Sequence, residues 1–180
     1  AKKGLCIQID TGNATIGEVE RAVDVALEEG CDRIVIHNCP SGYPARLESI
    51  NLRIIPTLKS MFGFPIAFSD HTAGWEMDIA AVALGANMVE KTITLDRTIR
   101  SPEHSFSLEP ADMRAFVRSI RDLEKALGST RRVMPADERT KAMAVRRSIV
   151  LSRDVKSNES VTEDALTYAR PGVGLRPELS

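Results

Sequence analysis

The sequence has few cysteines and no long apolar stretch. Its three cysteines, Cys6, Cys31 and Cys39, are an odd number without a Cys-x-x-Cys spacing, and such a set is typical of reduced thiols in a cytoplasmic protein. No apolar run approaches the about 20 residues that a helix needs to cross a bilayer. We therefore expect neither a disulfide scaffold nor a membrane partner, and we predict a cytoplasmic location.

An excess of charge is also missing. Lysine and arginine number 24, aspartate and glutamate number 25, and the net charge is −1. A protein that binds nucleic acid non-specifically usually has a basic excess or a concentrated basic patch. The pairs Arg131-Arg132 and Arg146-Arg147 are too short to form one. The charge balance therefore argues against a nucleic-acid partner.

What the sequence does have is an alternation of short apolar runs with segments of helical spacing. Apolar residues make up 43% of the 180 residues, enough for a sizeable core. The predicted strands are 5–9, 33–37, 65–68 and 88–93, and three predicted helices are 15–29, 76–84 and 111–127. A further helix is expected to end near Phe62 and to begin no earlier than about Asn51, because Pro56 is tolerated only near a helix start. This order is typical of an α/β fold with a parallel sheet and right-handed crossovers. Four such units make half of an eight-stranded barrel.

The alternation stops after Gly128. Residues 129–145 are charged and contain Pro135, so we predict a linker or extended arm there. Residues 146–180 contain β-like runs at 148–151 and around Val161, followed by a turn-rich tail. These 35 residues are few for an independent core, so we expect the opening of a small second domain. Because the sequence starts at Ala1 and soon enters a strand, we expect it to be a fragment.

The most reactive stretch is Ser69-Asp70-His71, which directly follows the apolar run 65–68. Parallel α/β folds carry their chemistry at the carboxyl ends of the strands. A hydroxyl, a carboxylate and an imidazole in this position therefore indicate a site. The alternative is that Asp70 and His71 are ordinary loop residues. As a lone histidine without a second ligand at metal-binding spacing, His71 could be either a metal ligand or a structural residue.

Other candidates follow or interrupt the remaining strands. At Thr11-Gly12 and Ser41-Gly42 the backbone N–H groups can approach an anion closely, although plain turn chemistry explains the same pattern. Glu90 lies inside an apolar strand, where an unpaired carboxylate is costly. Its neighbour in the sequence, a lysine, is an unsuitable partner because adjacent strand residues point to opposite faces. We therefore predict a site role for Glu90, with a structural ion pair as the alternative.

Six motifs together resemble the sialic acid synthase (N-acetylneuraminate synthase) family: FSDHT at 68–72, AAVALGA at 80–86, EKTITLDR at 90–97, SLEP at 107–110, RRSIV at 146–150 and RPGVG at 170–174. The resemblance implies the second half of a (β/α)8 TIM-type barrel over 1–128 and a truncated antifreeze-like domain over 146–180. It also implies a domain-swapped homodimer. The implied reaction condenses phosphoenolpyruvate with N-acetylmannosamine or a related diacetamido hexose to a nonulosonic acid, releases phosphate and uses a divalent metal, Mn²⁺ or Mg²⁺. A piece of such an enzyme is expected to be inactive alone.

The resemblance also assigns roles to individual residues. Those implied to bind phosphoenolpyruvate are Thr11, Gly12, Ser41 and Ser69, and those implied to contact the sugar are Tyr43, Glu103 and Arg170. Glu90 is the implied catalytic acidic residue, and His71 is an implied metal ligand. His104 is the candidate replacement for a second ligand, because Thr92 stands where the family usually has histidine.

A further departure is Asp10, which replaces the usual serine before Thr-Gly. Two other readings stand beside the synthase: a related barrel that binds a sugar without catalysis, and a different metal-dependent barrel aldolase. Phosphate release from phosphoenolpyruvate separates the synthase from both.

Overall fold

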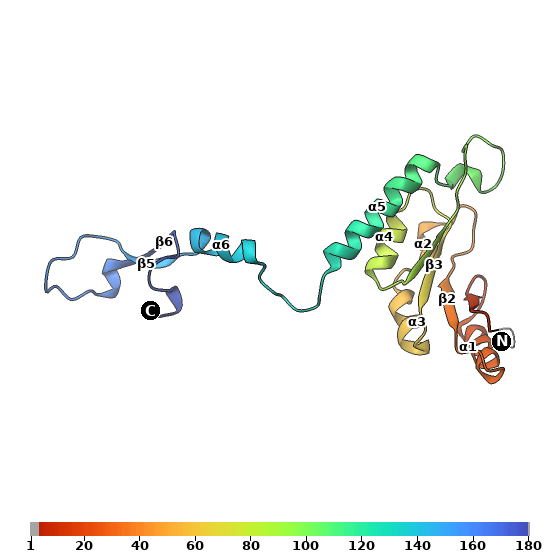
Figure 1. Ribbon diagram of the computed structural model, residues 1–180, viewed down its shortest axis with the longest axis horizontal. Helices are drawn as coiled ribbons and strands as arrows, with labels where there is room; N and C mark the ends of the chain where they lie inside the picture. The colour runs from red at the N-terminus through yellow and green to blue at the C-terminus, as the bar shows by residue number, and fades with distance from the viewer. Residues whose placement is uncertain (1–3, 180) are drawn as a thin grey trace. The chain divides into compact units, whose positions relative to one another are not determined.

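The computed structural model describes residues 4–179, and the chain divides into two compact units, 1–128 and 129–180 (Figure 1). The first unit alternates strands and helices. Its elements are β1 (Ile7–Asp10), α1 (Ile16–Glu28), β2 (Ile34–Asn38), α2 (Leu47–Ile50), α3 (Ile54–Phe62), β3 (Ile66–Asp70), α4 (Glu76–Ala83), β4 (Met88–Lys91), the 3-10 helix η1 (His104–Phe106) and α5 (Pro110–Leu127). Among the described residues, no helix is long and apolar enough to cross a membrane.

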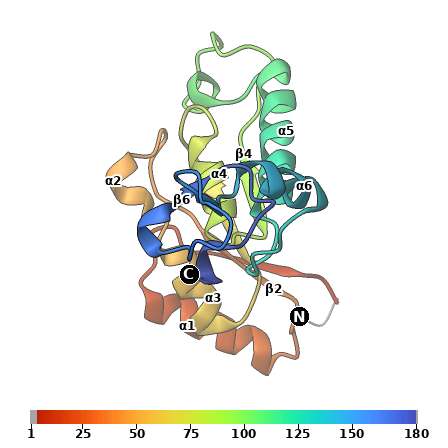
Figure 2. The same ribbon diagram turned by 90° about the vertical axis from the view of Figure 1, so that its left-hand side faces the viewer.

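The four strands form one parallel sheet in the order β1-β2-β3-β4, which confirms the predicted α/β architecture. Each strand therefore pairs with the next along the chain, the strand order of a β/α barrel. Helix α5 packs beside α4 (Figure 2). The parallel strands place their carboxyl ends along one edge, where the loops that follow them meet.

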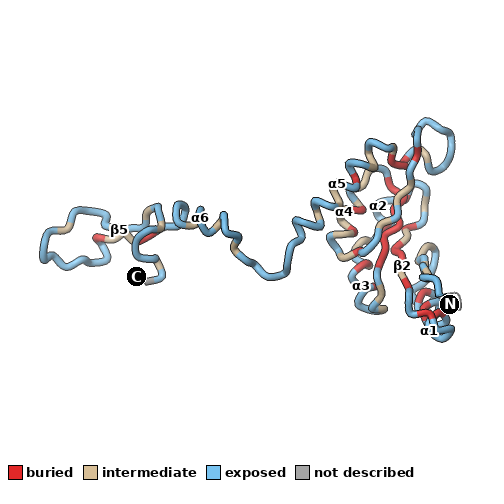
Figure 3. Tube along the Cα trace, viewed as in Figure 1, coloured by how far each residue is buried: buried red, intermediate tan, exposed pale blue. Residues whose placement is uncertain are grey.

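The apolar core lies between the sheet and the helices. Alternate strand residues contribute to it, as expected when successive side chains point to opposite faces. Its strand members are Ile34, Ile36, Ile66 and Phe68, and its helix members include Val19, Val23, Ile55, Leu58 and Ala81. Burial follows β2 and β3, the two central strands, in Figure 3. Full burial of side chains of this size contributes about 1.5–3 kcal/mol each.

The intervening strand residues form the other face of the sheet, which we call the open face. Its members are Gln8, Asp10, Val35, His37, Ala67, Ser69, Met88 and Glu90. Gln8, Asp10, Met88 and Glu90 are exposed, although they lie within strands. One face of the sheet packs on the apolar core, and the open face is polar and accessible. The open face is therefore suited to carrying a functional site.

The region before α3 differs from the sequence-based expectation. The short helix α2 was not predicted, whereas the start of α3 at Ile54 agrees with the expectation that this helix begins no earlier than about Asn51. Asn51 has a left-handed backbone (φ 49°) and ends α2. Asparagine tolerates this conformation better than most non-glycine residues, and Asn51 therefore ends α2 before α3 begins.

The second unit contains α6 (Ala136–Val145), β5 (Ser148–Leu151), the 3-10 helix η2 (Glu163–Ala165), β6 (Leu166–Ala169) and the 3-10 helix η3 (Pro177–Leu179). Strands β5 and β6 pair antiparallel. The expectation of an extended arm is wrong over α6, which begins directly after Pro135 and carries acidic residues in its first turn, as helix starts favour. The strand expected around Val161 is also wrong, because a turn with Asn158 at φ 66° occupies that region and the strand forms at β6.

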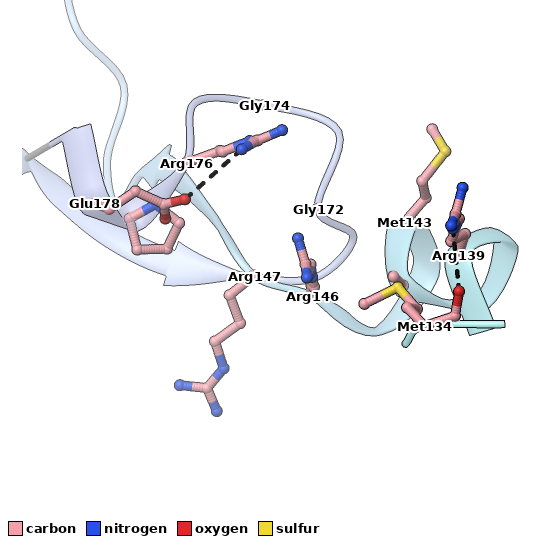
Figure 4. Close-up of a pocket in the computed structure, with 11 residues that line it drawn as sticks. Met134, Arg139, Met143, Arg146, Arg147, Gly172, Gly174, Arg176 and Glu178 are labelled. Atoms are coloured by element: carbon pink, nitrogen blue, oxygen red, sulfur yellow. Dashed lines mark hydrogen bonds and ion pairs between the residues drawn. The ribbon is translucent and has the colours of Figure 1, made fainter. Parts of the chain in front are cut away.

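A hollow of about 530 Å³ in this second unit is lined partly by arginines (Figure 4). Arg146 and Arg147 point in opposite directions. The nitrogen Nη1 of Arg176 lies 3.9 Å from Glu178 Oε1. Both Arg146 and Arg147 nevertheless line the same hollow.

Candidate functional site

Four polar side chains connect across the open face at the carboxyl half of the strands. Ser69 and Glu90 are register partners on β3 and β4, and the Ser69 hydroxyl donates to Glu90 Oε1 at 2.9 Å. Glu90 Oε2 lies 3.8 Å from His37 Nδ1 on β2. His37 Nε2 lies 2.7 Å from Gln8 Oε1 on β1. The register partner of His37 on β3 is Ala67, whose side chain is small, and the register partner of Glu90 on β3 is Ser69.

The carboxylate of Glu90 is accessible rather than buried. Its side chain is 60% exposed, whereas the side chain of His37 is 4% exposed. The premise that Glu90 is a buried, unpaired acid is therefore corrected: it has a hydroxyl donor and an imidazole beside it, and it faces the open side. The expectation that Lys91 does not pair with Glu90 is confirmed, since Lys91 contacts acids on the opposite face.

The loops after β1 and β2 lie side by side. The backbone N–H of Cys39 donates to Thr11 Oγ1 at 3.2 Å, and the Ser41 hydroxyl donates to Asn13 Oδ1 at 2.8 Å. Thr11 and Ser41 both line a hollow of about 330 Å³ at this edge. The structure thus brings together two of the predicted anion-binding positions.

At Gly12 the backbone lies close to Asp10 and Cys39, and its N–H group is already hydrogen-bonded within the loop. A Cβ at Gly12 would lie 3.0 Å from Asp10 Oδ1 and 3.7 Å from the carbonyl O of Cys39. The Gly12 N–H donates to Asp10 Oδ1 at 2.6 Å. Asp10 therefore occupies the backbone donor that the sequence pattern offered to an anion.

The Cys39 thiol is protonated at neutral pH. Burial is the largest cause, and a hydrogen bond with Asp10 and the charge of Asp10 follow it; together they raise the pKa of Cys39 to about 11. Because the thiolate is the nucleophilic form of cysteine, Cys39 is unsuited to covalent catalysis.

The three residues Ser69, Asp70 and His71 do not converge on one point. Ser69 lies on the open face, and Asp70 is buried on the helix-facing side. His71 is also buried, in the turn that follows β3. Its Nδ1 lies 3.3 Å from the carbonyl O of Pro40, and its ring stacks on Tyr43 with centroids 4.5 Å apart. The turn after β3 is thereby attached to the loop after β2.

Asp70 belongs to a buried cluster with Lys91 and Asp78. Lys91 Nζ lies 2.5 Å from Asp70 Oδ2 and 3.7 Å from Asp78 Oδ2. Neither carboxyl oxygen of Asp78 accepts a hydrogen bond from the described residues. Burial, and next the neighbouring Asp70, raise the pKa of Asp78 to about 8, while Lys91 acts against this rise. Asp78 is thus largely protonated at neutral pH, and the cluster then holds one negative and one positive charge.

The raised pKa of Asp78 predicts a pH-dependent stability. Between the unfolded pKa near 3.8 and the folded pKa near 8 the native state binds the extra proton, so stability falls as pH rises through this window. We expect Asp78→Asn to remove this pH dependence. The free energy of unfolding of the variant, relative to wild type, should therefore increase by roughly 2 kcal/mol as pH rises from about 6 to about 8. Denaturant unfolding of both proteins at several pH values measures the difference. A constant difference over this range would contradict the assignment.

Two predicted residues lie in the loop after β4, and a third lies in the second unit. His104 Nδ1 lies 2.6 Å from the Thr94 hydroxyl in the loop after β4, and Glu103 is exposed next to it. Arg170 is exposed at the end of β6, in the second unit. Among the described residues no hydrogen bond or ion pair joins Glu103 or His104 to His71 or Glu90.

The described residues do not supply a complete set of ligands for the expected metal ion. Within residues 4–179 no group of three or more His, Cys, Asp or Glu side chains could hold a metal ion. His71 has its Nδ1 facing a backbone carbonyl, an arrangement also found in histidines that bind metal through the other nitrogen. These residues do not form a complete metal site by themselves.

Four residues of the site escaped the sequence-based search: Gln8, His37, Asp78 and Lys91. Gln8 and His37 could have been detected, because each is a polar residue in an otherwise apolar strand. Each also lies two positions from another open-face residue of its own strand. Asp78 gave no signal, because an acid in the first turn of a helix is ordinarily explained by the helix dipole.

A parallel sheet in sequential strand order, with an acid, a hydroxyl and an imidazole along its carboxyl edge, is an arrangement typical of β/α-barrel enzymes. The NeuB family model matches residues 1–132, and the chain belongs to this family. The resemblance read from the motifs is thereby confirmed.

Relatives of known name agree with this assignment. The chain is 37% identical over 177 residues to an N,N'-diacetyllegionaminic acid synthase of Campylobacter jejuni, covering 97% of the chain and 53% of the relative. The structure of an N-acetylneuraminic acid (sialic acid) synthetase from Leptospira borgpetersenii superposes with a TM-score of 0.71 at 34% identity, covering 78% of this chain and 49% of that one. A truncated 3-deoxy-D-arabino-heptulosonate 7-phosphate synthase from Thermotoga maritima, at 15% identity and a TM-score of 0.62 over 71% and 52% of the chains, shares the fold alone. The chain spans about half the length of the curated relatives it matches.

Proposed function

We propose that these residues form part of a synthase that condenses phosphoenolpyruvate with an N-acetylated amino sugar to a nonulosonic acid. The observation that supports the proposal most is the Ser69–Glu90 pair on the open face, joined to His37 and open to a substrate. Family membership and the names of the relatives supply the reaction class. In this reaction C3 of phosphoenolpyruvate bonds to the aldehyde carbon of the sugar, water adds to C2, and inorganic phosphate leaves.

Glu90 is the proposed proton carrier. It takes a proton from the attacking water and returns it to the former aldehyde oxygen, so that the carboxylate is regenerated. The Ser69 hydroxyl and His37 hold the carboxylate in position from two sides. Thr11 and Ser41, together with Ser69, form the proposed phosphoenolpyruvate subsite. Gly12 contributes to this subsite only by its lack of a side chain, because its N–H is bound to Asp10.

The sugar subsite is proposed at the opposite side of Glu90. Tyr43, stacked on His71, and Glu103 provide polar contacts there, and Arg170 binds the N-acetyl carbonyl. The sugar is a diacetamido hexose or N-acetylmannosamine, the two types that the names of the relatives suggest. We further propose a cytoplasmic homodimer with exchanged second units.

A divalent metal, Mn²⁺ or Mg²⁺, is proposed with His71 as one ligand. Since the described residues supply no complete donor set, the remaining ligands come from elsewhere in the protein, with His104 as the candidate within this chain. When bound, such a metal polarises the aldehyde as a Lewis acid.

Phosphate release tests the proposal. The intact protein, incubated with phosphoenolpyruvate and Mn²⁺, should release phosphate only when a suitable amino sugar is present. Binding of the sugar without phosphate release would favour a non-catalytic sugar-binding barrel. Turnover of an aldehyde with another carbon donor would favour a different barrel aldolase.

A further inference from the structure

Lys91 is a charged residue that the proposed chemistry does not use. Its side chain is 2% exposed, and its ammonium group lies between Asp70 Oδ2 at 2.5 Å and the carbonyl O of Thr72 at 2.6 Å. Asp70 is the last residue of β3, and Thr72 lies in the turn that follows it. A lysine is rarely buried to this extent unless it is paired and hydrogen-bonded, so this geometry requires an explanation.

The turn that Lys91 holds carries His71. Within the turn, Asp70 Oδ1 accepts the N–H of Thr72 at 2.9 Å, and the Thr72 hydroxyl donates to both Asp70 oxygens. Asp70 therefore closes the turn, and Lys91 attaches the closed turn to β4. His71, in the middle of this turn, accepts the N–H of Ala45 on its own carbonyl O at 3.0 Å.

Lys91 also links the two faces of the sheet. It directly follows Glu90, and adjacent strand residues point to opposite faces. Glu90 therefore lies on the open face, while Lys91 fixes the same segment of β4 to the turn on the other face. Lys91 is thus separated from Glu90 by one peptide unit, and it contacts Asp70, the residue before His71.

We propose that Lys91 is a positioning residue: through Asp70 and the Thr72 carbonyl it fixes His71 and the loop 40–45 relative to Glu90. The inference rests on the proposed function only in taking His71 and Glu90 as site residues. A purely stabilising role explains the arrangement less well, because a buried ion pair is often replaceable by apolar residues at little cost in stability.

The double variant Lys91→Met with Asp70→Asn tests the proposal in the intact protein. It removes both charges together, so no uncompensated charge is buried, and the new amide oxygen can still accept the Thr72 N–H. The matched control is Lys59→Met. Lys59 donates to Gly85 O at 3.2 Å and to Asn87 Oδ1 at 3.4 Å, ahead of β4 at the amino ends of the strands.

Two readouts are expected to change together in the double variant. The kcat should fall roughly 10- to 100-fold while the KM for phosphoenolpyruvate stays within about threefold, as for groups that orient a site rather than bind substrate. Hydrogen exchange should become faster in the segments 40–46 and 69–75, because the turn is no longer attached to β4. The Lys59→Met control should change neither readout.

Each result decides the proposal. A lower kcat with unchanged exchange would assign Lys91 to the chemistry itself, and faster exchange with unchanged kcat would leave it only a structural role; both overturn the positioning role. If the wild-type protein shows no synthase activity, the proposed function fails, but exchange in the two segments still decides whether Lys91 fixes the turn.

Discussion

Replacing His71 with alanine in the intact protein is expected to lower metal-dependent turnover by roughly 1,000-fold or more, the range seen when an essential electrostatic group is removed. The imidazole is buried, and its Nδ1 is held by the carbonyl O of Pro40, so its other nitrogen has a fixed direction. Titration with Mn²⁺ should show a large loss of affinity in the same variant. Unchanged activity would contradict the role of His71.

Loss of packing is the competing explanation for this effect, because His71 also stacks on Tyr43. Tyr43→Leu is the matched control: it removes the stacked ring and leaves the imidazole in place. We expect this variant to retain Mn²⁺ affinity. His104→Ala tests the second proposed ligand, and reduced Mn²⁺ affinity in that variant would show that the loop after β4 contributes to the same site.

Arg170→Ala is expected to raise the KM for the amino sugar by roughly 10- to 100-fold, the cost of one charge-assisted hydrogen bond, with a smaller effect on phosphoenolpyruvate. A guanidinium presents a rigid set of donors to an amide carbonyl, so Arg170→Lys should restore binding only in part. Arg170 lies in the second unit, and we propose that it serves the first unit of the partner chain.

A mixing experiment tests this exchange. If the arginine acts on the partner chain, an Arg170→Ala subunit paired with a His71→Ala subunit has one intact site, and random mixing should recover roughly a quarter of full activity. When both substitutions are in one chain, its heterodimer with wild type has one defect in each site. An arginine that acts within its own chain reverses the two results.

Local signals in the sequence predicted the first unit well. The helix predicted to start at residue 15 is confirmed by α1, whose first turn is capped by Glu18 Oε2 accepting the Thr15 N–H at 2.7 Å. The parallel sheet followed from the alternation of strands and helices, which requires no knowledge of tertiary contacts. The extended arm over α6 was wrong because proline and charge were taken as loop signals, although both are favourable at a helix start.

Site residues could be predicted only where their position in a strand determined the face of the sheet on which they lie. Ser69 and Glu90 could be placed on the open face by alternation, and the structure pairs them directly. The Asp70–Lys91–Asp78 cluster could not be predicted, because it depends on how closely α4 approaches the sheet. The distance between α4 and the sheet is set by the packing of core side chains, and the spacing of residues along the sequence does not predict it.

The formation of product from labelled phosphoenolpyruvate tests the central claim most directly. The intact protein would be supplied with phosphoenolpyruvate carrying ¹³C in all three carbons, Mn²⁺ and either amino sugar, and product and phosphate would be quantified together. The account predicts a nonulosonic acid that contains the three labelled carbons, formed in equal amount with phosphate and lost in Glu90→Gln. Absence of this acid with both sugars, or full activity of Glu90→Gln, would contradict it.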